Sequence, residues 1–316
     1  MSRFIASLVA AAVLAGCGFA AAPEKSEAAV LVGIGDQDPS MFTDPLFTQL
    51  GIRNARYFPS WDVALPARAE EAGWLDQWLN QAQAAGVTPL ISFNVNLGSR
   101  CPNRPCNLPT VRQYTKAFKE FRRRWPTVNV ISPWNEANHR SQPTFKNPKR
   151  AAQFYNVVRA NCPGCKIVAA DVIDEVNMER WLKVFKKTAK RPRIWGLHNY
   201  RDTNKRKGQR LGGTKRLLKA VQGDVWLTET GGIVKFVLPN GHTLFRKSES
   251  RANRATKRMF ALAKQYRSRI KRLYIYQWKQ SSTDNRFDAG LVRRDGTPRP
   301  AYFTVRNQLN TSTFNP

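Results

Sequence analysis

The chain has 316 residues, and its 52 basic and 22 acidic side chains give a formal net charge of +30. Hydrophobic residues make up 42% of the sequence and aromatic residues 11%, which is enough for a large core and excludes a globally disordered chain. The five cysteines are too few for a miniprotein built on disulfides. A chain of this length forms about two ordinary domains or a single α/β barrel.

The N-terminus carries an apolar run, Phe4–Ala15. This run is too short to span a bilayer, because a membrane helix needs about 20 residues, but it fits the apolar region of a signal peptide. It ends in the sequence LAGC, which resembles a bacterial lipobox and predicts that Cys17 is lipidated. We therefore expect a signal peptide over residues 1–17, with ordinary secretion and cleavage within 20–29 as the alternative. Both place the mature protein outside the cytoplasm, and lipidation would anchor it to a membrane.

Residues 18–28 show no periodicity and are interpreted as a tether. From residue 29 onward, short β-branched or aromatic runs alternate with stretches of helical periodicity. The expected strands are Val30–Gly35, Ile52–Phe58, Thr88–Phe93, Val128–Pro133, Lys166–Val172, Ile194–Leu197, Val225–Thr228 and Arg272–Trp278. The clearest expected helices are 67–85, 109–125, 149–161, 175–189, 212–222 and 249–268, with weaker patterns at 41–50 and 299–309.

This alternation predicts a parallel sheet covered by helices. Eight such units fit a closed (β/α)₈ TIM barrel, so we expect one α/β domain over residues 29–316. A doubly wound open sheet is the alternative, but no glycine-rich dinucleotide or phosphate-binding motif follows any expected strand.

The cysteines of the expected barrel fall at opposite ends. Cys101 and Cys106 follow the third strand, whereas Cys162 and Cys165 precede the fifth. A shared site would have to join the two ends, so we expect two local disulfides, Cys101–Cys106 and Cys162–Cys165, typical of an oxidising compartment. A redox role for the CPGC run at Cys162 is the alternative.

Two glutamates end otherwise apolar strands. Glu136 closes the fourth strand in SPWNE, and Glu229 closes the seventh in VWLTE. Catalytic side chains of such barrels lie at the carboxyl ends of the strands, so both carboxylates are expected at the same open end. A pair of carboxyl groups can cleave a glycosidic bond, one as the proton donor and the other as nucleophile or base.

With these residues the chain resembles the clan A glycoside hydrolases, especially the family five-like endo-glucanases and mannanases, over roughly residues 30–310. The resemblance implies Glu136 as acid/base, Glu229 as nucleophile and Asn135 as the ligand of the sugar 2-hydroxyl. It further implies that Arg56 keeps the nucleophile ionised. It also implies that the Tyr200 hydroxyl bonds to the nucleophile and that Trp278 lies under the sugar. His198 matches the histidine that the family pairs with this tyrosine.

The third strand departs from the family pattern. The family usually has a histidine after this strand, whereas the chain has Asn94, which we interpret as a substitute hydrogen-bonding group. Trp61 and His139 also follow strands and are candidate sugar contacts, with packing inside the loops as the alternative. A partly apolar surrounding beside Trp134 is expected to raise the pKa of Glu136.

These features predict a retaining glycoside hydrolase acting on the O-glycosidic bonds of a poly- or oligosaccharide, with β linkages as the expected class. A non-catalytic carbohydrate- or cell-wall-binding surface protein is the alternative. The basic stretch 201–219 follows the sixth strand and would favour an anionic glycan or wall polymer. No cofactor or metal is expected, because the chain has only three histidines and no ligand spacing. Nucleic acid is not an expected partner, and a monomer is the default.

Overall fold

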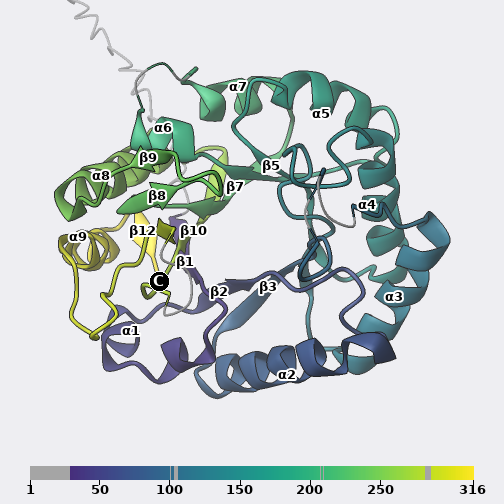
Figure 1. Ribbon diagram of the computed structural model, residues 1–316, viewed down its shortest axis with the longest axis horizontal. Coiled ribbons are helices and arrows are strands. Elements are labelled where there is room, and N and C mark those ends of the chain that lie inside the picture. The colour runs from purple at the N-terminus through teal and green to yellow at the C-terminus, as the bar shows by residue number, and fades with distance from the viewer. Residues whose placement is uncertain (1–28, 100, 103–105, 207, 209, 282–285) are drawn as a thin grey trace, which may run out of the picture.

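The computed structural model describes residues 29–316 except 100, 103–105, 207, 209 and 282–285. The predicted signal peptide, Cys17 and the tether lie outside these residues. In the described part, eight parallel strands form a closed barrel, because the last of them pairs with the first (Figure 1). The barrel strands are β1 (Val30–Gly35), β2 (Asn54–Tyr57), β3 (Thr88–Ser92), β4 (Val130–Ser132), β5 (Lys166–Ile173), β6 (Ile194–His198), β7 (Asp224–Thr230) and β10 (Ile270–Tyr276). The predicted (β/α)₈ barrel is confirmed.

Helices surround the barrel as an outer ring (Figure 1). They are α1 (Pro45–Leu50), α2 (Ala69–Ala84), α3 (Val111–Arg124), α4 (Pro148–Asn161), α5 (Met178–Lys186), α6 (Tyr200–Asn204), α7 (Gly213–Ala220), α8 (Glu249–Gln265) and α9 (Pro300–Leu309), with 3₁₀ turns η1 (Pro39–Thr43) and η2 (Pro66–Arg68). Local sequence sets several of their starts. At α3, for example, Thr110 and Gln113 form a reciprocal capping box.

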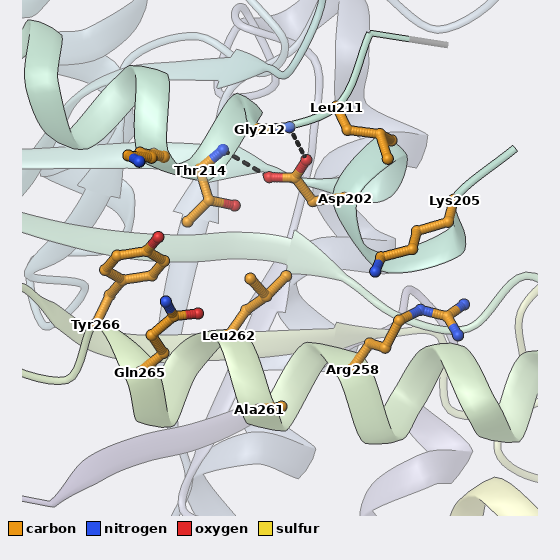
Figure 2. A pocket seen from close by; sticks show the side chains of 11 residues that line it. Asp202, Lys205, Leu211, Gly212, Thr214, Arg258, Ala261, Leu262, Gln265 and Tyr266 are labelled. Carbon is orange, nitrogen blue, oxygen red and sulfur yellow. Dashed lines mark hydrogen bonds between the residues drawn. The ribbon is translucent and has the colours of Figure 1, made fainter. Parts of the chain in front are cut away.

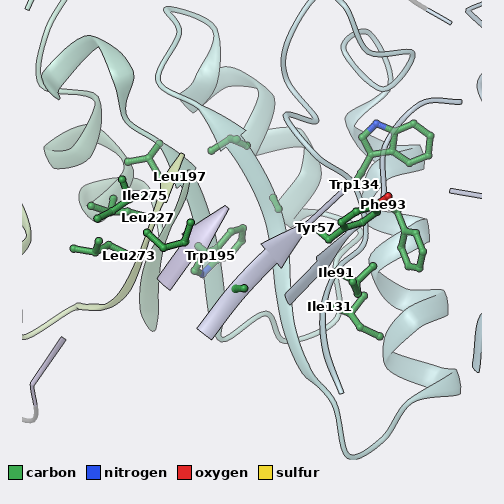
Figure 3. Close-up of a cluster of buried hydrophobic side chains, with 14 of the residues drawn as sticks. Tyr57, Ile91, Phe93, Ile131, Trp134, Trp195, Leu197, Leu227, Leu273 and Ile275 are labelled. Atoms are coloured by element: carbon green, nitrogen blue, oxygen red, sulfur yellow. The ribbon is translucent and has the colours of Figure 1, made fainter. Parts of the chain in front are cut away.

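Alternation along the strands sorts side chains between the helices and the barrel interior. Tyr57 and Ile91 pack outward in the main apolar cluster, part of which Figure 3 shows. Their chain neighbours Arg56 and Leu90 face the interior, as expected from the period of two in a β-strand.

The barrel interior changes from apolar to polar toward the carboxyl ends of the strands. The apolar layer consists of Leu90, Val130, Val168, Trp226 and Tyr274. Two residues further along three of these strands come the hydroxyl side chains Ser92, Ser132 and Thr228. The polar layer therefore lies under the mouth of the barrel, which is the open end formed by the carboxyl ends of the strands.

A small antiparallel sheet, absent from the sequence prediction, lies beside the ends of β7 and β10 (Figure 1). It is formed by β8 (Lys235–Val237), β9 (Thr243–Phe245) and β11 (Phe287–Asp288), and the short β12 (Phe314–Asn315) pairs with β1. Phe236 packs edge-on against Phe287 at 5.2 Å between ring centroids. These contacts fix the long segment after β7 against the loop after β10.

Both predicted disulfides are present. The Cα–Cα distance is 4.9 Å for Cys101–Cys106 and 5.4 Å for Cys162–Cys165. Such bonds are typical of proteins outside the cytoplasm. Among the described residues, no helix has both the length and the apolar character needed to cross a membrane.

Candidate active site

The two glutamates meet at the mouth from different strands. Glu229 lies near the end of β7 and is in register with His198 at the end of β6. Glu136 lies in the turn after β4, with its backbone in the left-handed region at a φ of 43°. A non-glycine residue rarely takes this conformation, and such strained positions concentrate at functional sites.

Arg56 joins the strands that carry this site. Its Nη1 donates to Glu229 Oε2 at 2.7 Å, and its Nη2 donates to Asn135 Oδ1 at 2.6 Å. The Arg56 Nε also donates to Ser92 Oγ at 3.0 Å. Burial disfavours the Arg56 charge, but the carboxylates of Asp171 and Glu229 outweigh this effect and raise the pKa of Arg56. The guanidinium is therefore a permanent cation under the mouth.

Tyr200, the first residue of α6, supplies the second hydrogen bond to Glu229. Its hydroxyl donates to Glu229 Oε1 at 2.9 Å, while Arg56 holds Oε2. Burial and the Glu229 charge raise the pKa of Tyr200 well above 10, so the phenol keeps its proton. Both oxygens of Glu229 are thus oriented, and its side chain is still 12% exposed at the mouth.

His198 lies between the two glutamates. Its Nδ1 is 3.2 Å from Glu136 Oε1 and 3.7 Å from Glu229 Oε2. Its Nε2 is 3.2 Å from Asp171 Oδ1 on the opposite side of the ring. Because the imidazole is completely buried, these carboxylates and the Arg56 guanidinium, whose Nη2 lies 3.4 Å from His198 Nε2, form its electrostatic surroundings.

The electrostatics of His198 and Glu136 overturn one expectation. Burial opposes a charged imidazole, but Glu229, Asp171 and the hydrogen bonds to Asp171 and Glu136 outweigh it and raise the pKa of His198 to about 10. For Glu136, burial acts upward, but the hydrogen bond and charge of His198, aided by His139 and Arg56, lower its pKa. The expected rise in the pKa of Glu136 was therefore wrong, because Trp134 is not the dominant neighbour of its carboxylate.

Asp171 on β5 is the residue that the sequence analysis missed. Its Oδ2 lies 3.2 Å from Ser132 Oγ and 3.4 Å from Arg56 Nη2, and Thr228 donates to Oδ1. Burial opposes its charge, but His198, Arg56 and the Thr228 hydrogen bond hold the pKa of Asp171 well below its usual range. A lone aspartate inside the apolar strand KIVAADVI was the available indication.

Gly196 on β6 makes the space that Asp171 occupies. A Cβ at this position would lie 2.5 Å from Asp171 Oδ1 and 2.9 Å from Thr228 Oγ1. Such distances are far below van der Waals contact, so a side chain here would displace the carboxylate. The glycine thus belongs to the architecture of the site although it carries no chemistry.

Trp278 does not lie under the sugar site, which corrects the expectation drawn from the family resemblance. Its ring is 1% exposed and packs edge-on against Phe47 at 5.5 Å, and its Nε1 donates to Asp44 at 3.1 Å. The reason is that β10 ends at Tyr276, two residues earlier than predicted. Tyr276 instead lies among the mouth aromatics, 6.1 Å from Phe58 and 6.0 Å from Phe287 between ring centroids.

The other predicted contacts take different places around the mouth. His139 Nδ1 lies 3.7 Å from Glu136 Oε2. Asn94 follows β3, and its buried Oδ1 has no hydrogen-bond partner within the described part of the chain. Trp61 lines a mainly polar cavity of about 350 Å³ together with Arg68, Asn96, Asn107 and Gln113.

A second cavity, of about 360 Å³, lies away from the mouth in the helical ring (Figure 2). Its walls come from α6, α7, α8 and the segment before α7, with apolar side chains such as Leu211 and Leu262. Asp202 accepts hydrogen bonds from the Gly212 and Thr214 amides at its edge. Neither catalytic candidate lines this cavity.

The chemistry of the site is that of two carboxylates with different neighbours. Glu229 is held by an arginine and a tyrosine, whereas Glu136 contacts imidazoles. Within the described residues, no group of three or more His, Cys, Asp or Glu side chains is arranged to hold a metal ion. The arrangement suits nucleophilic attack by one carboxylate and proton transfer by the other.

Comparison with known proteins agrees with this fold. No family model matches the chain, and no curated protein matches it. A family 39 glycoside hydrolase from Bacteroides cellulosilyticus is 14% identical with a TM-score of 0.56, covering 87% of this chain and 62% of its own. A GH5_18 structure from Streptomyces cattleya in complex with GlcNAc is 15% identical with a TM-score of 0.64, and the match covers 91% of this chain and 81% of that one. A GH39 β-xylosidase from Caulobacter crescentus is 13% identical with a TM-score of 0.63, and the match covers 91% of this chain and 72% of that one. At these identities the likeness establishes that the chain shares the barrel fold of these three structures.

Proposed function

We propose that this protein is a retaining glycoside hydrolase that cleaves O-glycosidic bonds of a poly- or oligosaccharide, with β linkages as the expected class. The observation that carries the proposal is the placement of two glutamates, one in the turn after β4 and one on β7, around one imidazole at the mouth of the barrel. Barrel enzymes place their chemistry at this end of the strands. The barrel fold shared with glycoside hydrolases of families 5 and 39 supports the same reaction class.

The two carboxylates divide a double displacement between them. Glu229 attacks the anomeric carbon as the bond to the leaving oxygen breaks, and the acid form of Glu136 gives that oxygen its proton. In the second step the Glu136 carboxylate takes a proton from water, and the water oxygen displaces Glu229 from the sugar. Arg56 and Tyr200 orient Glu229 for the attack.

The spacing of the carboxylates favours the retaining route. Glu136 Oε1 and Glu229 Oε2 both lie within 3.7 Å of His198 Nδ1. Retaining enzymes hold their carboxyl groups about 5–5.5 Å apart, whereas inverting enzymes leave room for a water at about 6.5–9.5 Å. Two oxygens that share one small neighbour match the shorter arrangement better.

The surfaces beside the glutamates suit a sugar chain. Tyr276, Phe58 and Phe287 form an aromatic wall near Glu229, and aromatic faces pack well against the C–H faces of sugars. The cavity beside Trp61 offers side-chain amides that could hydrogen-bond sugar hydroxyls. One of them, Asn96, has an Oδ1 with no hydrogen-bond partner among the described residues. We assign this cavity to the binding of further sugar units. We assign to His139 the sugar contacts beside Glu136.

We further propose that the protein acts outside the cytoplasm. The two disulfides and the N-terminal apolar run support export. Lipidation at Cys17 would retain the protein at a cell surface. The net charge of +30 supports attraction to an anionic glycan or wall polymer over a neutral one.

Azide rescue tests the reaction class. Wild type, Glu229→Ala and Glu136→Ala are assayed on a panel of aryl β-glycosides that includes glucuronides, and then on polysaccharides. We expect Glu229→Ala to be inactive until azide is added and then to form a glycosyl azide of inverted configuration. Glu136→Ala should yield the azide of retained configuration. Glu120→Ala, on the outer surface of α3, is the matched control and should behave as wild type.

Two outcomes would contradict the proposal. Azide products of the opposite configurations would exchange the roles of the two glutamates. Binding of the same glycans by wild type and Glu229→Ala, with cleavage by neither, would make the protein a carbohydrate-binding surface protein on a barrel scaffold.

A further inference from the structure

The proposed reaction requires a proton on Glu136, yet the structure places two imidazoles and a guanidinium close to this carboxylate. His198 Nδ1 lies 3.2 Å from its Oε1, and His139 Nδ1 lies 3.7 Å from its Oε2. Arg56 adds a positive charge from below. These neighbours stabilise the ionised form, so the proton for the leaving group must be held elsewhere until the substrate binds.

We propose that His198 stores this proton on Nδ1 in the free protein, and that Asp171 is the positioning residue that holds the Nε2–H on the other side of the ring. The inference rests on the proposed function and assigns a role to a residue, Asp171, that the reaction itself does not use.

The surroundings of His198 support a doubly protonated ring. The groups that face it are the carboxylates of Glu136 after β4, Asp171 on β5 and Glu229 on β7, together with the Arg56 guanidinium on β2. Three negative charges therefore face one positive charge. A second cation in the centre brings the cluster closer to neutrality, which a buried site requires.

Asp171 is held too firmly to follow the ring passively. Its Oδ2 lies near Ser132, Ser92 and Arg56, and Thr228 donates to its Oδ1. The absence of a Cβ at Gly196 leaves the carboxylate room to approach the ring. A rigid acceptor 3.2 Å from Nε2 fixes the imidazole so that Nδ1 remains aimed at Glu136.

The transfer balances within the site. When the glycosidic oxygen and the sugar displace water at Glu136, the proton moves from His198 Nδ1 to Glu136 Oε1, leaving a neutral imidazole that keeps its Nε2–H on Asp171. Glu136 then gives this proton to the leaving oxygen as Glu229 bonds to the anomeric carbon. In the second step Glu136 takes a proton from the attacking water and returns it to Nδ1, which restores the starting state.

One competing arrangement makes a different prediction. Arg56 Nη2 also lies 3.4 Å from His198 Nε2. If this nitrogen accepted from the guanidinium, the ring would be neutral with its only proton on Nδ1. Asp171 would then have no part in holding the proton.

Nitrogen-15 NMR of the imidazoles separates these states without a substrate. The chain has only three histidines, so spectra of His139→Asn and His242→Asn assign the His198 signals in the wild-type protein. At pH 7 we expect both His198 nitrogens to carry protons in wild type and one of them to lose its proton in Asp171→Asn. A neutral wild-type ring protonated on Nδ1 alone would overturn the proposal whether or not the protein hydrolyses any glycoside.

Leaving-group dependence tests the functional consequence. Asp171→Asn is compared with wild type on dinitrophenyl glycosides, whose leaving group needs no protonation, and on glycosides with poor leaving groups. We expect a loss of about 10–100-fold in kcat for the poor leaving groups and a change of less than about 3-fold for dinitrophenyl, because general acid catalysis contributes on this scale. In the Glu136→Gln background, Asp171→Asn should cause no further loss.

A purely structural role for Asp171 gives another pattern. Equal losses for both leaving groups, or a loss that adds fully to that of Glu136→Gln, would contradict the proposal. An inactive wild type would instead count against the proposed function, and the NMR result would still decide the proton on His198.

Discussion

Arg56 and Glu229 lie 173 residues apart in the chain, yet Arg56 Nη1 donates to Glu229 Oε2 at 2.7 Å beneath the mouth of the barrel. The same guanidinium donates to Asn135 beside the second glutamate. One buried side chain on β2 thus fixes the turn after β4 and the end of β7 relative to each other. Neither catalytic candidate is positioned by its own strand alone.

Arg56→Lys is therefore expected to damage both activity and stability. A lysine has one ammonium and cannot reproduce the bonds of the guanidinium to Glu229, Asn135 and Ser92. Breaking a buried charge pair costs roughly 3–5 kcal/mol, so the free energy of unfolding should fall by about that amount. We expect kcat to fall at least about 100-fold, measured on the best aryl glycoside alongside urea unfolding.

Arg53→Lys is the matched control on the same side of the barrel. Arg53 is exposed, and its Nη1 donates to the Ala85 carbonyl at the opposite end from the mouth. It should change kcat by less than about 2-fold, because exposed polar contacts contribute little. Unaltered turnover in Arg56→Lys would mean that Glu229 is oriented by other groups.

Tyr200→Phe isolates one hydrogen bond to the nucleophile. The substitution removes only the hydroxyl that donates to Glu229 Oε1 at 2.9 Å. Hydrogen bonds to charged groups contribute about 1.5–3 kcal/mol, so kcat should fall about 10–100-fold with KM little changed. Steady-state kinetics check this expectation. A rise in KM at constant kcat would instead assign the hydroxyl to substrate binding.

Tyr276 and Trp278 form a matched pair that tests the corrected position of the aromatic contact. Tyr276→Ala removes a ring from the mouth and should raise KM for oligosaccharides at least about 5-fold. Trp278→Phe changes a ring that is buried between the barrel and its helices. It should lower the melting temperature and leave KM within about 2-fold of wild type. The reverse assignment of the two effects would restore Trp278 to the site.

The barrel and the glutamates could be predicted from the sequence because both depend on local patterns. Buried parallel strands form apolar runs, and a carboxylate that ends such a run has only the mouth to face. Glu229 near the end of β7 is an example of this rule, and Glu136 reaches the mouth from the turn after β4. The cysteine pairs were predictable for a related reason, since each lies within one loop.

The failures concern long-range contacts and exact strand ends. Asp171 can be recognised as a site residue only through its contacts with His198 and Arg56, which lie on other strands. The pKa of Glu136 was predicted from its chain neighbour Trp134, whereas His198 decides it. Trp278 was misplaced because a strand that ends two residues early points different side chains into the mouth.

Asp174 is expected to make stability fall as the pH rises. Burial and the neighbouring Asp202 charge raise the pKa of Asp174 to about 7, although the Asp202 and Arg201 amides donate to its Oδ2. Its Oδ1 has no hydrogen-bond partner among the described residues. The folded-state pKa of Asp174 lies above the ordinary 3.8, so its protonated form stabilises the fold. This stabilisation is complete below about pH 4 and is lost as the pH rises through about 7.

Asp174→Asn removes the ionisation and keeps an oxygen for the two amides. The difference in the free energy of unfolding, variant minus wild type, should therefore rise between pH 5 and pH 8 by on the order of 2–4 kcal/mol. Urea unfolding at the two pH values measures this difference, and Glu120→Gln on the exposed face of α3 should follow wild type at both. Because every other titrating group is common to the variant and the wild type, the changing gap reports the ionisation of Asp174 and its coupling to Asp202. A constant gap at the two pH values would show that folded Asp174 does not titrate between pH 5 and pH 8, which would contradict a pKa near 7.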